Sequence, residues 1–159
     1  MILVLLGTQN KPFSRILKKV ENLKKENKIK DKIIAQTGCT NYSSDYIETF
    51  NYVTKDKLFE LMDEARIIIT HGGVGTIIEC LNKNKKVIVV PRLKKYREHT
   101  NDHQIQITKE FAEKGYVIPL LNDNDLLDEI KNISKFNPNK YESNAEKFKE
   151  NLILYIDSL

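Results

Sequence analysis

Short apolar runs alternate with amphipathic segments along almost the whole chain. The apolar runs are rich in β-branched residues and have the length of buried strands. Between most of them, apolar residues recur every three or four positions, which predicts helices. The predicted strands cover residues 2–6, 32–36, 46–50, 66–70, 86–90 and 116–120, and the predicted helices begin near residues 12, 55, 73, 102, 126 and 138.

This alternation predicts the fold class. Continuous β-branched strands separated by amphipathic helices indicate an α/β fold: a doubly wound, mostly parallel sheet with helices on both faces. The sequence contains no repeat, low-complexity tract or obvious linker, so residues 1–159 are expected to form a single domain. In sheets of this kind, ligands bind at the carboxyl ends of the strands, near the point where the strand order reverses.

Composition narrows the class of protein. The chain is 40% hydrophobic and 30% charged, which is typical of a globular domain and excludes wholesale disorder. Its net charge of +4 comes mainly from dispersed lysine, so nucleic acid is not expected as a partner. Cys39 and Cys80 have neither disulfide-scaffold nor zinc-knuckle spacing, which favours a reducing compartment. The apolar residues 1–6 are too short for a signal peptide or a membrane span, so membrane contact is expected to be peripheral or through a partner.

The strongest chemical signal is the segment His71-Gly72-Gly73-Val74-Gly75-Thr76, with Glu79 one turn later. A predicted strand leads into three glycines that open a helix. Glycines let the backbone approach a bulky anion, and the first helical N–H groups favour negative charge. Thr76 adds a hydroxyl, and Glu79 can accept hydrogen bonds from a ribose diol. The alternative is that the glycines only make a tight turn between strand and helix.

Two further polar loops follow predicted strands. Pro91-Arg92 and residues 97–104 (Arg97-Glu98-His99-Thr100-Asn101-Asp102-His103-Gln104) offer side chains that can bond sugar hydroxyls. The segment Gly7-Thr8-Gln9 ends the first strand and should open on the same edge of the sheet. Basic residues around the 86–90 strand could hold a diphosphate, face anionic lipid headgroups or simply be solvated. These are Lys83, Lys85, Lys86, Arg92, Lys94, Lys95 and Arg97.

Together with Pro12-Phe13, these three segments resemble, in order, the C-terminal domain of glycosyltransferase family 28. The resemblance extends to single-domain bacterial capsular and exopolysaccharide transferase subunits, which are similar to the soluble subunit of the dolichol-linked N-acetylglucosamine transferase. It implies the Rossmann-like half of a GT-B glycosyltransferase that binds a UDP-sugar. The donor-binding residues it implies are Gly7, Thr8, Gln9, Gly72, Gly73, Gly75, Thr76, Glu79, Arg92, Glu98, His103 and Gln104.

The resemblance also implies an activity. The expected reaction is an inverting transfer of a hexose, with galactose or glucuronic acid favoured, from a UDP-sugar to a lipid-diphosphate-linked saccharide in capsule or exopolysaccharide synthesis. No cofactor or metal is expected. A separate membrane-anchored subunit would bind the acceptor and recruit this cytoplasmic chain to the inner face of the plasma membrane. His71 and His99 are the candidate bases, unless the base lies in that partner. A C-terminal helix over about 138–157 would dock the partner or close the chain's own core.

Other interpretations stay open. The chain could be a non-catalytic module that binds a nucleotide-sugar for regulation, or a homo-oligomeric transferase complete on its own. A dinucleotide reductase is disfavoured because the first strand leads to Gly7-Thr8-Gln9 rather than GxGxxG. Asp123-Asn124-Asp125 has the form of a metal-binding motif, but a helix start is favoured. His99 and His103 with Glu98 could hold a metal, although a sugar-binding loop is favoured, and Cys80 is expected to be a packing residue.

Overall fold

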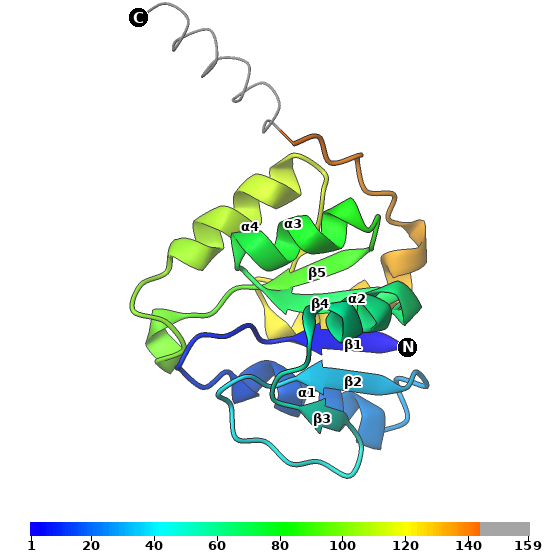
Figure 1. The fold of residues 1–159 in the computed structure, drawn as a ribbon, viewed down its shortest axis with the longest axis vertical. Coiled ribbons are helices and arrows are strands. Elements are labelled where there is room, and N and C mark those ends of the chain that lie inside the picture. The colour runs from blue at the N-terminus through cyan, green and yellow to red at the C-terminus, as the bar shows by residue number, and fades with distance from the viewer. Residues whose placement is uncertain (144–159) are drawn as a thin grey trace, which may run out of the picture.

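Six parallel strands form one sheet in the spatial order β3-β2-β1-β4-β5-β6. The computed structural model describes residues 1–143, and Figure 1 shows helices packed around this sheet. The strand bounds differ from the predicted apolar runs by at most two residues at either end. The strands are β1 (Ile2–Leu5), β2 (Ile33–Gln36), β3 (Glu48–Phe50), β4 (Ile67–His71), β5 (Val87–Val90) and β6 (Ile118–Pro119).

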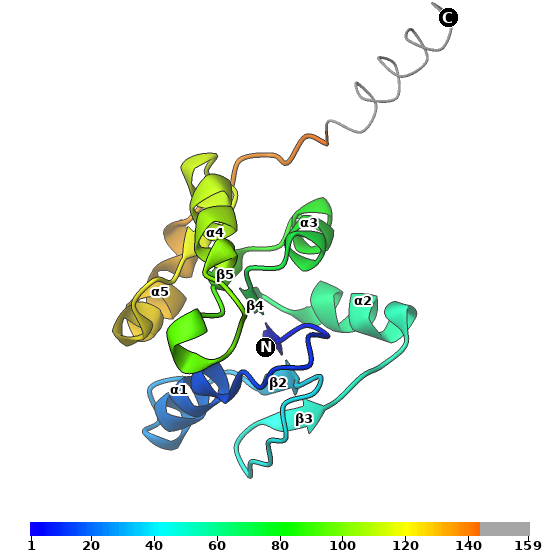
Figure 2. The same cartoon turned by 90° about the vertical axis from the view of Figure 1, so that its left-hand side faces the viewer.

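Helices cover both faces of the sheet (Figure 2). Helices α1 and α5 pack on one face and α2, α3 and α4 on the other, which confirms the predicted doubly wound fold. None of the helices within residues 1–143 is long and apolar enough to cross a bilayer. The helices are α1 (Ser14–Lys25), α2 (Lys55–Glu64), α3 (Val74–Asn82), α4 (His103–Glu113) and α5 (Leu126–Asn132), with short 3-10 turns η1 (Lys94–Tyr96), η2 (Asp123–Asp125) and η3 (Ile133–Lys135).

The core divides into two layers because successive strand residues point to opposite faces of the sheet. In β1, Ile2 and Val4 are buried with α1 and α5, whereas Leu3 and Leu5 are buried with α2, α3 and α4. Every residue of β1 is fully buried, as expected for a central strand with neighbours on both sides. The free thiol of Cys80 lies in the second layer, which confirms its packing role.

Local signals explain several helix ends. The Thr54 hydroxyl accepts a hydrogen bond from the Lys57 N–H and so caps α2. Gly115, which follows α4, has a left-handed φ of +71°. The side chain of Asn122 accepts from the N–H of Asn124 at the start of η2, which leads into α5. The Asp123-Asn124-Asp125 segment is therefore a helix start, as the sequence favours.

The segment after η3 differs from the prediction. Residues 138–143 are not helical, so the helix predicted over about 138–157 does not begin there. The Asn139 side chain donates to the carbonyl of Lys114, and the Tyr141 ring packs edge-on against Tyr116 with centroids 5.5 Å apart. These contacts hold the segment against the end of α4. The rest of that prediction, including the apolar stripe from residue 145, lies outside the described residues.

The strand order reverses between β1 and β4. From β1 the chain moves outward through β2 to β3, then crosses back to β4 and moves outward through β5 to β6 on the other side. The loops after β1 and β4 therefore lead to helices on opposite faces of the sheet. In folds of this class ligands bind between two such loops, and we refer to this place at the carboxyl edge as the crevice. Both glycine-containing segments identified in the sequence lie at this edge.

Candidate functional site at the carboxyl edge of the sheet

The imidazole of His71 lies between two glycines at the strand crossover. A Cβ atom added to Gly7 would be 2.5 Å from His71 Cε1, and one added to Gly73 would be 2.3 Å from His71 Nε2. Gly7 also has a left-handed φ of +77°, which disfavours any larger residue. Both positions need glycine because the ring occupies the space that a side chain would fill. The structure thus brings together the loops after β1 and β4, as predicted.

His71 is held in its neutral form. Burial, followed by the positive charge of Arg92, lowers the pKa of His71 to about 4. Its Nδ1 lies 3.3 Å from the hydroxyl of Thr70, which itself donates to the carbonyl of Leu5. We infer that Nδ1 carries the proton, because the Thr70 oxygen then accepts it. Nε2, on the side of Gly73, is left with a free lone pair.

The first turn of α3 has no internal partner for its N–H groups. Gly73 occupies the N-cap position without a side-chain cap, and no acidic residue lies in the first turn. The first intrahelical hydrogen bond runs from the Ile77 N–H to the Gly73 carbonyl. A Cβ on Gly75 would meet no atom within 4 Å, so this turn borders open space. Unpaired N–H groups, the helix dipole and free space together suit an anion such as a diphosphate.

Glu79 lies one turn further along α3. Its side chain is 38% exposed, and its carboxylate is 3.7 Å from the ammonium of Lys55, the first residue of α2. Because this weak surface pair is the only partner of the carboxylate within residues 1–143, the carboxylate can accept hydrogen bonds from a ligand. This position beside the uncapped start of α3 is compatible with the predicted contact to a ribose, which stays a prediction.

The sequence did not single out Tyr52, an exposed aromatic residue next to the loop after β1. The Tyr52 side chain is 52% exposed, and its hydroxyl lies 3.2 Å from the thiol of Cys39 in the loop after β2. In the same loop, a Cβ on Gly38 would be 2.3 Å from the Gly7 carbonyl, which places this loop against the one after β1. An exposed aromatic ring here offers a flat apolar surface to a nucleobase. No local pattern distinguishes such a ring from a core aromatic residue.

Arg92 is not exposed to a ligand, contrary to the prediction that it binds the donor. Its side chain is 1% exposed and stacks above the Phe13 ring, with 4.8 Å between the guanidinium carbon and the ring centroid. The guanidinium donates to the carbonyls of Leu6 (2.8 Å), Lys11 (2.7 Å) and Glu98 (3.2 Å). Arg92 therefore ties the loop after β1 to the loop after β5, beneath the crevice.

Glu98 is also directed inward, which corrects its predicted role as a donor contact. It is 3% exposed and accepts two hydrogen bonds of 2.9 Å from the Arg15 guanidinium. Its carboxylate accepts a third from the Leu93 N–H at 3.0 Å. Arg15 additionally bonds Asp123 and the carbonyl of Pro91. This network fixes the loop after β5 on α1 and leaves Glu98 unavailable to a metal or a sugar.

Gln104 joins the ends of β4 and β5. Its buried side-chain oxygen accepts from the N–H groups of Gly72 and Arg92, both at 3.0 Å. A Cβ on Gly72 would be 2.8 Å from Gln104 Cβ, so Gly72 allows this close approach. The amide nitrogen of Gln104 has no recorded partner within the described chain. That nitrogen is the part of Gln104 that remains able to contact a sugar.

The remaining predicted residues lie nearer the surface. Thr8 and His103 are exposed, Gln9 is half-buried, and His103 begins α4. His99 is half-buried and accepts from the Asn101 N–H through Nδ1. It lies close enough to His71 for its charge to contribute to the lowered pKa of His71. Among residues 1–143, no three His, Cys, Asp or Glu side chains are grouped as metal ligands.

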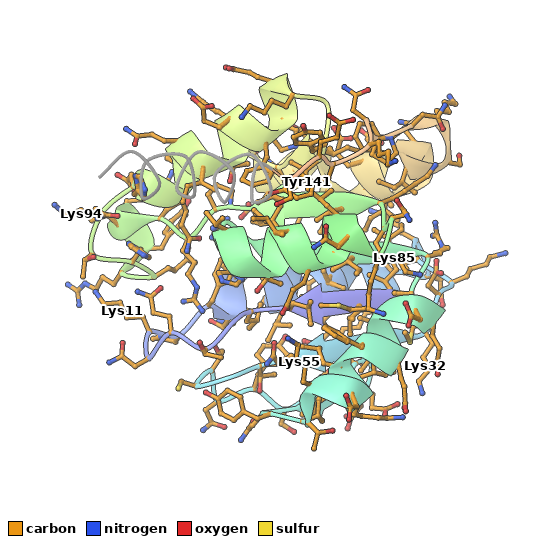
Figure 3. All side chains as sticks on the ribbon, turned by 45° about the horizontal axis from the view of Figure 1, so that its top comes forward. Lys11, Lys32, Lys55, Lys85, Lys94 and Tyr141 are labelled. Atoms are coloured by element: carbon orange, nitrogen blue, oxygen red, sulfur yellow. The ribbon has the colours of Figure 1, made fainter. Side chains whose placement is uncertain are left out.

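Three of the seven basic residues lie far from the crevice. Lys83 pairs with Asp63, and Lys85 and Lys86 donate to main-chain carbonyls at the ends of α2 and η3. These three lie at the amino edge of the sheet and cannot hold a diphosphate in the crevice, which corrects that interpretation. Figure 3 shows the separation, with Lys32 and Lys85 at one end of the sheet and Lys11 and Lys94 at the other.

The strand order and the helices on both faces of the sheet define a Rossmann-like α/β domain, with the candidate site at its strand crossover. The chain matches the glycosyltransferase family 28 C-terminal domain over residues 1–156. It is 28% identical over 81 residues to the UDP-N-acetylglucosamine transferase subunit ALG13 of Candida albicans, covering 51% of this chain and 26% of that protein. A solution structure of ALG13 superposes with a TM-score of 0.62 at 21% identity, covering 91% of each chain.

A bacterial relative gives a similar result. The chain is 34% identical over 104 residues to the UDP-N-acetylglucosamine–N-acetylmuramyl-(pentapeptide) pyrophosphoryl-undecaprenol N-acetylglucosamine transferase of Streptococcus agalactiae, covering 63% of this chain and 28% of that protein. The chain thus spans about a quarter of the length of these two curated relatives. It belongs to glycosyltransferase family 28, as the motifs indicate, and its fold is the Rossmann-like half of a GT-B glycosyltransferase.

The buried Arg15–Glu98 pair gives a stability prediction. We expect Glu98→Gln to lower the free energy of unfolding by ~2–3 kcal/mol, because it leaves part of a buried cationic network without its anion. Urea-induced unfolding measures this change. Glu60→Gln, which removes the anion of the exposed Lys57–Glu60 pair, is the control and should have no measurable effect. Equal stability of Glu98→Gln and the unsubstituted chain would show that the network contributes little.

The lowered pKa of His71 gives a pH prediction. The unfolded chain binds a proton at this residue near pH 6.5, whereas the folded chain does so near pH 4. The free energy of unfolding should therefore fall by up to ~3 kcal/mol from this residue as pH is lowered through that window. Thermal or urea unfolding from pH 7 to pH 4 should show a smaller decrease for His71→Asn. Identical pH profiles would contradict the neutral assignment.

Proposed function

We propose that this chain binds the UDP-sugar donor of an inverting glycosyltransferase at the amino end of α3. The observation that carries the proposal is the uncapped first turn of that helix, open beside Gly75, at the strand crossover of a family 28 domain. A diphosphate can accept hydrogen bonds from the N–H groups of Val74, Gly75 and Thr76 while the helix dipole favours its charge.

The ribose, base and sugar of the donor would contact residues around this diphosphate site. Glu79, one turn along α3, would accept hydrogen bonds from the ribose diol, and the exposed ring of Tyr52 would lie against the base. The free amide nitrogen of Gln104 and the exposed His103 would contact the sugar. Thr8, exposed in the loop after β1, would lie near the β-phosphate or the acceptor.

The chemistry follows from these positions. The acceptor oxygen forms a bond to the anomeric carbon as the bond to the β-phosphate oxygen breaks, and UDP leaves with that electron pair. Attack from the side opposite the diphosphate inverts the anomeric centre. The fixed N–H groups of α3 stabilise the charge that develops on the diphosphate without reorganising. The proton of the acceptor hydroxyl goes to a base: His71 Nε2, His99 or a group from a partner.

The proposal includes a second component. The acceptor-binding half would be a separate membrane-anchored protein that presents a lipid-diphosphate-linked saccharide at the cytoplasmic face of the membrane, in capsule or exopolysaccharide synthesis. The Candida relative is itself named as a subunit, and the ALG13 structure matches this chain over 91% of both lengths. The names of both relatives favour N-acetylglucosamine as the sugar, whereas the motif resemblance favours galactose or glucuronic acid.

Calorimetric titration of the purified chain with UDP and a panel of UDP-sugars tests the proposal and ranks the sugars. We expect Glu79→Ala to weaken UDP binding by ~1–3 kcal/mol, because a hydrogen bond to the ribose is lost. Glu60→Ala removes a comparable exposed carboxylate from α2 and should leave the affinity unchanged. Absence of UDP binding, or equal effects of the two substitutions, would contradict this placement. Turnover by the chain alone would favour the homo-oligomeric alternative.

A further inference from the structure

Positive charge at the carboxyl edge of the sheet is left without partners. The side chains of Lys11, Lys94 and Arg97 make no recorded hydrogen bond or ion pair within the described chain. Lys95 only stacks on the Tyr96 ring, at 4.8 Å from its centroid. Arg15 binds two neighbouring acids, Glu98 and Asp123. The Asp102 carboxylate accepts from the Lys94 N–H and keeps its negative charge, so it offsets only one of these four cations. These side chains therefore keep a net positive charge.

Exposed apolar side chains lie among these cations. The turn η1 presents Tyr96 at 51% exposure, and Leu121, after β6, is 49% exposed. Both line one depression whose other lining is mainly polar: Arg15, Leu93, Lys95, Asn122, Asp123 and Asn124. An adjoining pocket of about 300 Å³ is more apolar, with Pro91, Leu93, Ile105 and Leu121 beside Lys95, Asp102 and Lys109. We refer to Lys94, Lys95, Tyr96, Arg97 and Leu121 as the η1 surface.

We propose that the η1 surface docks on a lipid bilayer that contains anionic headgroups. Lysine and arginine near such a bilayer are attracted to its phosphates, while a tyrosine ring and a leucine can enter the boundary between headgroups and acyl chains. An acidic protein surface would complement the charge. However, lysine is depleted from protein–protein interfaces, whereas at a bilayer its long side chain keeps the ammonium at headgroup level.

Docking would orient the candidate site. The η1 surface follows β5 and the first turn of α3 follows β4, so both lie at the carboxyl edge of the sheet. A bilayer against the η1 surface would bring the crevice close to headgroups, where a lipid-diphosphate-linked acceptor is held. This consequence rests on the proposed function, whereas the docking itself can be measured independently of donor binding.

Vesicle flotation with the full chain tests the docking. Vesicles of phosphatidylcholine are compared with vesicles that also contain about 30% phosphatidylglycerol, at moderate salt. Lys94→Gln/Lys95→Gln should weaken binding to the anionic vesicles about 20-fold. The control is Lys30→Gln/Lys131→Gln, which changes two exposed lysines away from the η1 surface and reduces the formal net charge from +4 to +2 in the same way. It should retain binding within about twofold.

Three outcomes would overturn the proposal: no preference for anionic vesicles, equal loss in both double variants, or no vesicle binding at all. The last would leave an acidic protein surface as the partner of this face. UDP titration of the same preparations separates the two proposals. A chain that binds UDP but not vesicles retains its proposed function and loses this inference, and a chain that binds vesicles but not UDP does the reverse.

Tryptophan fluorescence reports which part of the chain meets the lipid. The chain contains no tryptophan, so Tyr96→Trp introduces a single reporter on the η1 surface. Tyr46→Trp, before β3, places the matched reporter at a residue that is 46% exposed in the unsubstituted chain. Anionic vesicles should shift the Tyr96→Trp emission to shorter wavelength, and brominated lipids should quench it, while the Tyr46→Trp emission stays constant. Equal responses at both positions would contradict docking through the η1 surface.

Discussion

The buried guanidinium of Arg92 is the interaction on which the shape of the site depends. It bonds three carbonyl oxygens, two from the loop after β1 and one from the loop after β5, and so fixes these loops relative to each other. Burial lowers the pKa of Arg92, and the charge of Glu98 offsets part of this effect. Burying a cation is costly unless it is hydrogen-bonded and compensated. The carbonyls, the Phe13 ring and the nearby Glu98 carboxylate provide that compensation.

Because these loops are fixed in this way, the loop before α3 can lack the usual helix-capping residues. Helix α2 begins with a threonine cap and an acid in its first turn, whereas α3 begins with a bare glycine and neither feature. The turn before α3 is instead fixed by Gln104, which binds Gly72, and by His71, whose ring fills the space beside Gly7 and Gly73. Departures of this kind are expected at functional sites, where groups are held ready for a ligand rather than paired internally.

Much of the fold could be predicted from local pattern. Apolar runs identify the strands, and Thr54, Gly115 and the Asp123-Asn124-Asp125 segment mark helix ends, because these signals act between residues close in sequence. The glycine segment at 71–76 could be singled out as a candidate ligand loop for the same reason. Partners far apart in sequence could not be predicted. Arg15 and Glu98 are separated by 83 residues, and neither carries a local sign that it will meet the other.

The roles of Arg92 and Glu98 in the loop after β5 could not be predicted, for a related reason. A sequence shows that Arg92 and Glu98 follow a strand, but not whether their side chains turn inward to brace the loops or outward to a ligand. Burial decides this, and burial depends on how the loop after β1 packs above them. Tyr52 shows the opposite error. An aromatic residue is usually expected in the core, whereas the ring of Tyr52 is exposed.

The most direct test of the account is an amide NMR titration of the ¹⁵N-labelled chain with UDP. The account predicts saturable shifts that are largest at the N–H groups of Val74, Gly75 and Thr76, because these groups would bond the diphosphate. Uridine, which lacks the diphosphate, should leave these three amides nearly unchanged. A contrary result would be largest shifts in the lysine-lined cavity of about 540 Å³ between α1 and β3, formed in part by Lys24, Lys30 and Tyr46. That outcome would place the nucleotide away from the strand crossover and contradict the assignment of the site to α3.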